Sequence, residues 1–188
     1  MRKLILASAS PRRQALLKQM GLSDFEIRPP AQEITAAHLP PDQAVLAVAQ
    51  AKGQSVTSTP GEMILAADTE VYFSGKLLGK PQSQQDAIQM LQALSGKKHT
   101  VYTGMVLLLD GREVTGVEET SVYFKTLTDT EIKRYVKSGE PMDKAGAYGI
   151  QGKAAHFIRR IEGDVYNVIG LPLYLLSELA QEMGVMLF

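Results

Sequence analysis

The stretch "LILASASPRR" at residues 4–13 constrains the fold most, because a short apolar run passes at once into a helix start. Residues 3–7 have the length and composition of a short buried strand. Ser10-Pro11 is a favoured beginning for a helix, since serine can cap it and proline is tolerated in its first turn. We expect that helix to stop at Gly21, because glycine is favoured just past helix ends. The chain therefore opens as strand, tight turn and helix.

Strands and helices are mixed along the rest of the chain. Apolar spacing and turn residues predict helices at residues 41–56, 83–96, 128–136 and 172–183, and strands at 63–73, 99–109, 113–127 and in the second half of 145–163. The segment 24–41 carries four prolines and is predicted to be mostly loop. Two of the strands flank Asp110-Gly111 and can pair around it. This mixture predicts an α/β fold, with a mixed twisted β-sheet and flanking helices, in one domain of residues 1–188.

The composition excludes several classes of function. The net charge is zero, so no global basic field attracts nucleic acid or an anionic membrane. The absence of cysteine excludes a disulfide framework, a thiol nucleophile and a zinc–thiolate site. The apolar run near the start is too short for a secretion signal, and no run approaches the length of a membrane span. We therefore expect a cytoplasmic protein with no membrane or nucleic-acid partner.

The first candidate site lies at the predicted start of the first helix. Free backbone N–H groups and the helix dipole favour an anion there. Ser8 and Ser10 add hydroxyl donors, and Arg12 and Arg13 add planar forks that suit phosphate oxygens. The alternative is a capped surface helix with two solvated arginines. The glycines of a Walker-type loop are absent.

The second candidate is Asp68, which follows the apolar run of a predicted buried strand in "ILAADTEV". A carboxylate at such a place can hold a divalent metal or act as a general base on water. The alternative is an aspartate that caps a turn. If the strand continues, Glu70 faces the same side, and the pair could share a metal or raise one pKa toward neutrality.

Two lysines and a glycine-rich segment complete the candidates. Lys52 and Lys80 lie beside turns, where each can meet an anion, although a solvated charge is the alternative for each. The segment "DKAGAYGIQGKAA" suggests close approach of the backbone to a flat ligand, or else a glycine-rich bend at a sheet edge. Gln151 within it carries the amide donor and acceptor needed to read a nucleobase edge. The three histidines show no ligand spacing. These residues together favour metal-assisted hydrolysis of a phosphoanhydride.

The same stretches closely resemble the Maf family, named for septum formation, nearly from end to end. The similarity lies in "LASASPRRQALL", in "AADTEV" followed by "GKLLGKP", and in "EPMDKAGAYGIQG" with "VYNVIGLP". It implies a two-lobed, Maf/ITPase-like α/β fold with the site in a central cleft. It also implies a nucleoside triphosphate pyrophosphatase that cuts between the α and β phosphates, uses a divalent cation (Mg²⁺ or Mn²⁺) and often forms a homodimer.

The resemblance also implies roles for individual residues. Ser8, Arg12 and Arg13 would bind phosphates, and Lys52 and Lys80 would neutralise the triphosphate. Asp68 would be the general base or a metal ligand, and Glu33 would bind metal or position water. Thr69 and Gln151 would lie near the nucleobase. The loop "AYGIQG" is similar to the branch that acts on dTTP and UTP.

Two positions depart from the family pattern. Glu70 stands where an apolar or small residue is expected, and Gln32 replaces a frequent acidic neighbour of Glu33. Rival functions are a nucleotide-binding regulator of cell division without essential turnover, another phosphohydrolase or nucleotidyltransferase, and an interaction domain with an incidental anion site. The identity of the product separates the enzymatic hypotheses.

Overall fold

A computed structural model describes residues 3–31, 35–36 and 38–187 of the chain. Glu33 and Gln32 lie outside these residues. The helices are α1 (Pro11–Gln19), α2 (Pro41–Gln54), α3 (Gln84–Leu94), α4 (Asp129–Lys137), α5 (Val165–Ile169) and α6 (Leu173–Glu182), with short 3-10 turns η1 (Glu140–Asp143), η2 (Ala145–Ala147) and η3 (Lys153–Phe157). Of the helices in this part of the chain, none is long and apolar enough to cross a membrane.

Within the described part of the chain, seven strands form one sheet. They are β1 (Leu4–Leu6), β2 (Phe25–Ile27), β3 (Met63–Phe73), β4 (Lys76–Leu78), β5 (Lys98–Leu109), β6 (Arg112–Phe124) and β7 (Ile158–Glu162). Their order is β2-β1-β3-β5-β6-β7, and β4 pairs with β3. The β1 pairings with β2 and β3 are parallel, whereas the other pairings are antiparallel. The sheet is therefore mixed, as predicted.

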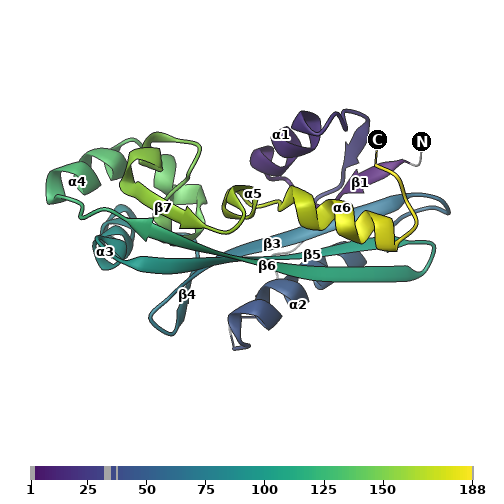
Figure 1. The fold of residues 1–188 in the computed structure, drawn as a ribbon, viewed down its shortest axis with the longest axis horizontal. Helices are drawn as coiled ribbons and strands as arrows, with labels where there is room; N and C mark the ends of the chain where they lie inside the picture. Colours follow the sequence, from purple (N-terminus) through teal and green to yellow (C-terminus); the bar gives the residue numbers. More distant parts are fainter. Residues whose placement is uncertain (1–2, 32–34, 37, 188) are drawn as a thin grey trace.

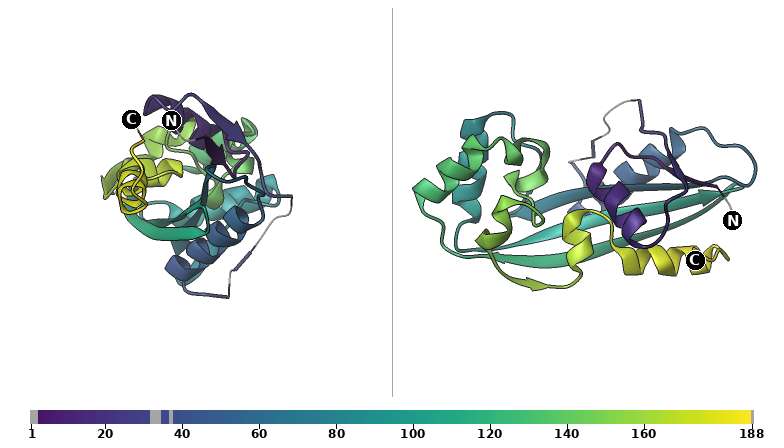
Figure 2. Two further views of the ribbon diagram at one scale, coloured as in Figure 1. Left: turned by 90° about the vertical axis from the view of Figure 1, so that its right-hand side faces the viewer. Right: turned by 90° about the horizontal axis from the view of Figure 1, so that it is seen from above.

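Three long strands, β3, β5 and β6, run side by side along the length of the molecule (Figure 1). The helix α2 covers one face of these strands, and α1 and α6 lie on the other side (Figure 2). The helices α3 and α4 stand at the end of the strands opposite to β1 (Figure 1). The helices α1, α2 and α6 thus lie along one part of the long strands, and α3 and α4 lie at the other end.

Each group of helices has its own apolar core. One core joins α1, α6 and β1 to the halves of β3 and β5 nearest to them, and includes Leu16, Leu65 and Leu107. The other joins α3, α4 and the glycine-rich segment to the far ends of β5 and β6, and includes Leu91 and Phe157. We call the part of the molecule around the first core the N-lobe and the part around the second core the C-lobe. The predicted two-lobed α/β fold is confirmed.

The structure differs from the sequence prediction in local detail. Ser10 is the N-cap residue of α1, but its side chain makes no capping hydrogen bond. The short strand β2 lies in the segment predicted to be mostly loop, β4 was not predicted, and the predicted strand over 113–127 ends at Phe124. β2 hydrogen-bonds to β1 and β4 hydrogen-bonds to β3, and a local pattern does not reveal such pairing.

Candidate active site

A gap along one edge of β3 creates the candidate site. β1 pairs with β3 only at residues 63–65, and β4 pairs with the same strand only at residues 71–73. β5 occupies the opposite edge throughout. The intervening stretch, which contains Asp68, Thr69 and Glu70, therefore has a strand on one side only. Side chains from both faces of β3 reach the opening.

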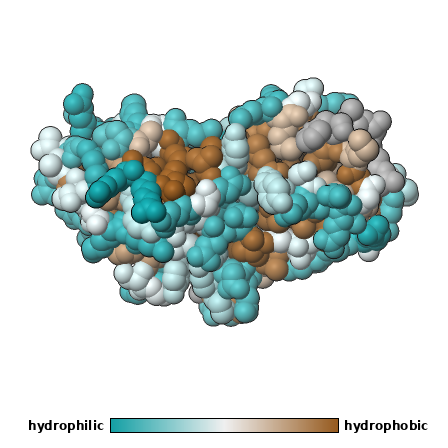
Figure 3. Space-filling view, in the orientation of Figure 1, coloured by the Kyte–Doolittle hydropathy of each residue, from teal (hydrophilic) through white to brown (hydrophobic). Residues whose placement is uncertain are grey.

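A large cavity occupies this gap between the lobes. Its volume is about 990 Å³, and its walls come from the β1–α1 turn, α2, β3, the segment after β4 and the loop around Gln151. The molecular surface is indented between the two lobes (Figure 3). The cavity is lined by eight of the nine predicted site residues, namely Ser8, Arg12, Arg13, Lys52, Asp68, Thr69, Lys80 and Gln151. The ninth, Glu33, lies outside the described residues.

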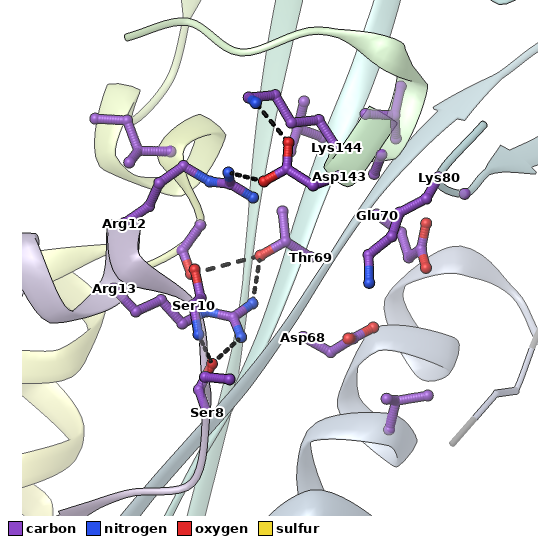
Figure 4. Close-up of a pocket in the computed structure, with 18 of the residues that line it drawn as sticks. Ser8, Ser10, Arg12, Arg13, Asp68, Thr69, Glu70, Lys80, Asp143 and Lys144 are labelled. Atoms are coloured by element: carbon purple, nitrogen blue, oxygen red, sulfur yellow. Dashed lines mark hydrogen bonds and ion pairs between the residues drawn. The ribbon is translucent and has the colours of Figure 1, made fainter. Parts of the chain in front are cut away.

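The register of β3 separates its polar residues onto two faces. Asp68 and Glu70 lie two residues apart within a continuous strand, so their side chains share a face. Thr69 points to the other face, toward α1 and α5 (Figure 4). The conditional prediction that both carboxylates face one side is confirmed by the length of the strand.

Lys52 reaches Asp68 because α2 packs very close to the sheet. The Lys52 Nζ atom lies 2.6 Å from Asp68 Oδ1, and both side chains are largely buried. Gly104 is paired with Asp68 across β3 and β5, and a Cβ atom at Gly104 would lie 2.5 Å from the backbone of Val45 in α2. The missing side chain thus lets the helix approach, and Lys52 follows two turns after Val45.

Glu70 has a strongly perturbed ionisation. Burial first, and then the neighbouring Asp68 charge, raise the pKa of Glu70 to about 7, although Lys52 and Lys80 act in the opposite direction. Lys80 lies beside Glu70 (Figure 4). Among the described residues, the Glu70 Oε2 atom is buried with no hydrogen-bond partner. A carboxyl group in this environment exchanges its proton near neutral pH.

Arg13 is buried in the wall of the cavity and held by three hydrogen bonds. Its Nε donates to the Gly170 carbonyl at 2.8 Å, its Nη1 to Ser8 Oγ at 3.1 Å and its Nη2 to Thr69 Oγ1 at 3.1 Å. Ser8 Oγ also accepts from the Ser10 backbone N–H. These bonds use three of the five guanidinium N–H groups and leave two for a ligand.

Arg12 spans the opening between the lobes. Its Nη1 lies 3.1 Å from Asp143 Oδ2 in η1, and the other Asp143 oxygen accepts from Lys144 Nζ at 2.6 Å (Figure 4). The Arg12 side chain is one-third exposed and that of Asp143 is two-thirds exposed. A phosphate oxygen entering the cavity would meet Arg12 already paired with a carboxylate.

The glycine-rich loop is held by contacts within the C-lobe. Both Glu140 carboxylate oxygens accept from the Lys153 backbone N–H, at 3.0 and 3.1 Å. Tyr135 also donates its hydroxyl to Glu140. A Cβ at Gly152 would lie 2.0 Å from a Glu140 oxygen, so a side chain at this position would displace the Glu140 carboxylate from its present place. The exposed Gln151 side chain sits between these anchored positions at the cavity wall.

Two carboxylates on β3 are the candidate metal-binding groups of the described cavity. Within the described ranges, no group of three or more His, Cys, Asp or Glu residues is arranged to hold a metal. Asp68 and Glu70 nevertheless present two carboxylates on one face, and one Glu70 oxygen is unsatisfied. Mg²⁺ is commonly bound by one or two carboxylates together with substrate phosphates. The residues present therefore fit a divalent cation that arrives with a phosphate ligand.

Sequence reasoning missed several residues that shape the cavity. Asp143 and Lys144 form the opposite wall, and Gly170 and Thr103 hold Arg13 and Thr69. The resemblance covers the motifs that contain three of these residues, but it gave them no role. The Thr69 hydroxyl accepts from Arg13, and the position of Thr69 near the base stays a prediction.

The chain is similar to known proteins along nearly its whole length. The family model described as "Maf-like protein" matches residues 3–183. A dTTP/UTP pyrophosphatase of Carboxydothermus hydrogenoformans is 49% identical over 185 residues, which cover 97% of this chain and 99% of the relative. A dTTP/UTP pyrophosphatase of Methanosarcina barkeri is 42% identical over 192 residues, which cover 100% of this chain and 98% of the relative.

Solved structures support the fold alone. A HAM1 protein from Coxiella burnetii aligns with a TM-score of 0.51 and 18% identity, covering 97% of this chain and 100% of the other. The Ham1 protein of Staphylococcus aureus aligns with the same TM-score and 11% identity, again covering 97% of this chain and 100% of the other. The arrangement of a mixed sheet with flanking helices is therefore shared with these proteins.

Proposed function

The chain belongs to the Maf family, and on that premise we propose that it is a nucleoside triphosphate pyrophosphatase acting on dTTP and UTP. The reaction cleaves the α–β phosphoanhydride and gives a nucleoside monophosphate and pyrophosphate. One geometric observation carries the proposal, because among the described residues five cationic side chains and three carboxylates line a single cavity. The cations are Arg12, Arg13, Lys52, Lys80 and Lys144, and the carboxylates are Asp68, Glu70 and Asp143. Relatives with 42–49% identity over nearly their whole length bear the name dTTP/UTP pyrophosphatase.

The proposed chemistry divides the cavity between charge neutralisation and water activation. Arg12, Arg13 and Lys80 bind phosphate oxygens and favour the charge that develops on the leaving pyrophosphate. Asp68 takes a proton from the attacking water or binds the metal. Lys52 fixes Asp68 by its bond to Oδ1 and leaves Oδ2 outside that contact. These assignments require substrate phosphates to replace or share the Arg12–Asp143 ion pair.

A divalent cation, Mg²⁺ or Mn²⁺, is part of the proposal. Asp68 and Glu70 would hold it together with phosphate oxygens, and Glu33 is a further proposed ligand. Bound there, the cation supplies positive charge to the phosphoanhydride. The unsatisfied Glu70 oxygen supports this assignment. We further propose that the protein acts in the cytoplasm on free nucleotides. We also propose that it forms a homodimer, and light scattering on the purified protein tests this oligomeric state.

Product analysis tests the activity directly. The protein is incubated with Mg²⁺ or Mn²⁺ and dTTP, UTP, CTP, ATP, GTP or 7-methyl-GTP, and the products are separated by ion-exchange chromatography. We expect pyrophosphate with dTMP and UMP, and little product from the purines. Orthophosphate or a transferred nucleotide would indicate a different phosphoryl reaction. Tight binding without turnover would favour a nucleotide-binding regulator of cell division.

Asp68→Asn tests the proposed base or metal ligand. We expect turnover to fall by about a hundredfold or more, because the amide can neither accept the proton nor provide a carboxylate to a metal. Nucleotide binding is expected to stay within a few fold of the unsubstituted protein. Asp110→Asn, at the β5–β6 hairpin, is the matched control. Near-normal turnover of Asp68→Asn would remove Asp68 from the mechanism.

Gln151→Ala tests the reading of the base. Gln151 can satisfy the O4 and N3–H edge that thymine and uracil share, and a base that covers the Gln151 amide without pairing with it is disfavoured. We expect the preference for dTTP over CTP in kcat/KM to fall by about tenfold or more. Gln85→Ala, an exposed glutamine of α3 outside the cavity, serves as control. An unchanged substrate ranking would exclude this role for Gln151.

A further inference from the structure

Two threonine hydroxyls connect Arg13 to the interior of the sheet. Thr69 and Thr103 face each other across β3 and β5, and their Oγ1 atoms are 2.9 Å apart. Thr103 is completely buried and does not line the cavity. It can influence a bound ligand only through other residues. The mechanism proposed above gives Thr103 no role.

The hydrogen-bond partners determine the direction of this chain. Thr103 Oγ1 lies 3.2 Å from the carbonyl oxygen of Asn167, which can only accept, so Thr103 donates there. A hydroxyl has one proton to donate, and Thr69 must therefore donate to Thr103. Thr69 in turn accepts from Arg13 Nη2. The bonds run one way, from Arg13 through Thr69 and Thr103 to Asn167.

The chain completes a rigid support for Arg13. The guanidinium Nε donates directly to the Gly170 carbonyl at the end of α5, and Nη2 connects through the threonines to the Asn167 carbonyl in the same helix. Because the guanidinium is planar, anchoring Nε and Nη2 fixes the plane of the group. The two N–H groups without a bond in this network then have fixed directions.

We infer that Thr103 is a positioning residue of the active site, which orients the Arg13 guanidinium toward the substrate phosphates through Thr69. This inference rests on the proposed pyrophosphatase function. Its physical basis is that donors fixed before the reaction stabilise developing charge without reorganisation. Loss of the Thr103 hydroxyl would leave the Thr69 proton with only the Gly170 carbonyl, at 3.5 Å.

Thr103→Val is the primary test, because valine matches the shape of threonine and cannot accept the Thr69 proton. We expect kcat for dTTP to fall about tenfold, while KM changes less than about threefold, because the oriented donors act mainly on the transition state. Thr103→Ser keeps the hydroxyl and is expected to restore kcat to within about twofold of the unsubstituted protein.

Thr120→Val is the matched control for lost stability. Thr120 is equally buried on β6, accepts from the Asn167 side chain and donates to the Asp164 carbonyl, without contacting Arg13. We expect this variant to lose thermal stability and keep its kcat. Equal losses of kcat in Thr103→Val and Thr120→Val at matched melting temperatures would overturn the inference.

A double-mutant cycle and a spectroscopic measurement complete the test. If Thr103 acts through Arg13, adding Thr103→Val to Arg13→Lys should lower kcat by less than about twofold. Additive losses would contradict the inference. Separate guanidinium Hη signals of Arg13 in ¹⁵N-arginine NMR should collapse in Thr103→Val and persist in Thr120→Val. This readout does not need turnover, so an inactive protein would refute the proposed function while the NMR signals still decide whether Thr103 holds Arg13.

Discussion

Glu70 illustrates how one buried carboxyl group couples ionisation to folding. Its pKa is raised from 4.5 to about 7, first by burial and then by the Asp68 charge. The folded protein therefore holds a proton at pH values where the unfolded chain has released it. Stability is greatest below the unfolded pKa and falls as the pH rises through the folded one. Above about pH 7, Glu70 is ionised in the folded protein, and its buried charge then lowers the free energy of unfolding by the full amount.

Glu70→Gln should remove this pH dependence, because the amide has a similar shape and no charge. We expect the variant to be more stable than the unsubstituted protein at pH 8, by at most about 3 kcal/mol, with the difference shrinking toward pH 5. Urea unfolding in the presence of EDTA at both pH values measures it. Glu178→Gln, on α6 far from the cavity, is the control. An equal difference at pH 5 and pH 8 would exclude titration of Glu70 as the cause.

At the scale of elements, the contact between α2 and β5 positions Lys52, a candidate catalytic residue, next to Asp68. The α-carbon of Gly104 faces the backbone at Val45, and any side chain there would collide with it at 2.5 Å. A backbone cannot yield as the end of a flexible side chain does, so the helix as a whole must move. The Lys52–Asp68 distance of 2.6 Å depends on this approach.

Gly104→Ala should therefore weaken both stability and turnover. We expect a destabilisation of about 1–3 kcal/mol from overpacking, with a loss of kcat as Lys52 is displaced from Asp68. Gly53→Ala is the control in the same layer, since the nearest atoms to its Cβ would belong to side chains and not to backbone, with Leu108 and Val106 at 3.1 Å and Ala66 at 3.5 Å. Chemical denaturation and steady-state kinetics on both variants measure the effects. A Gly104→Ala protein with normal kcat would show that α2 need not lie so close.

The sequence predicted the long elements because each has its own periodic pattern. The strand over 63–73 appears in the structure as expected, and the helix predicted over 128–136 begins with a capping box at Thr128. The short strands β2 and β4 escaped prediction because three residues are too few to show a period, and a local pattern does not reveal their pairing with β1 and β3. Ser10 has the residue type of a cap without the capping bond.

The candidate site was predictable where charge stands out against an apolar run. Asp68 is such a residue, and the cavity brings it together with the predicted arginines and lysines. Asp143 and Thr103 carry no comparable signal. A charged residue in a loop and a threonine in a strand are ordinary, and their importance arises only from partners 131 and 34 residues away.

At the scale of the whole molecule, the two lobes meet across the cavity through polar contacts. The ion pair of Arg12 with Asp143 joins the start of α1 in the N-lobe to η1 in the C-lobe. Both side chains are partly exposed, and pairs of this kind contribute about 0–1 kcal/mol to stability. Its main effect is therefore on the availability of Arg12, since the Asp143 carboxylate occupies the arginine that phosphates would use.

Asp143→Asn should improve substrate binding with little change in stability. We expect KM for dTTP to fall about two- to fivefold, because the neutral amide competes less with phosphate for Arg12. The difference should shrink at about 0.5 M salt, where exposed charges are screened. Kinetics at low and high salt measure it, and Asp129→Asn on α4, outside the cavity, is the control. A raised KM would mean that Asp143 orients Arg12 for the substrate, and that the ion pair belongs to the closed, productive arrangement of the lobes.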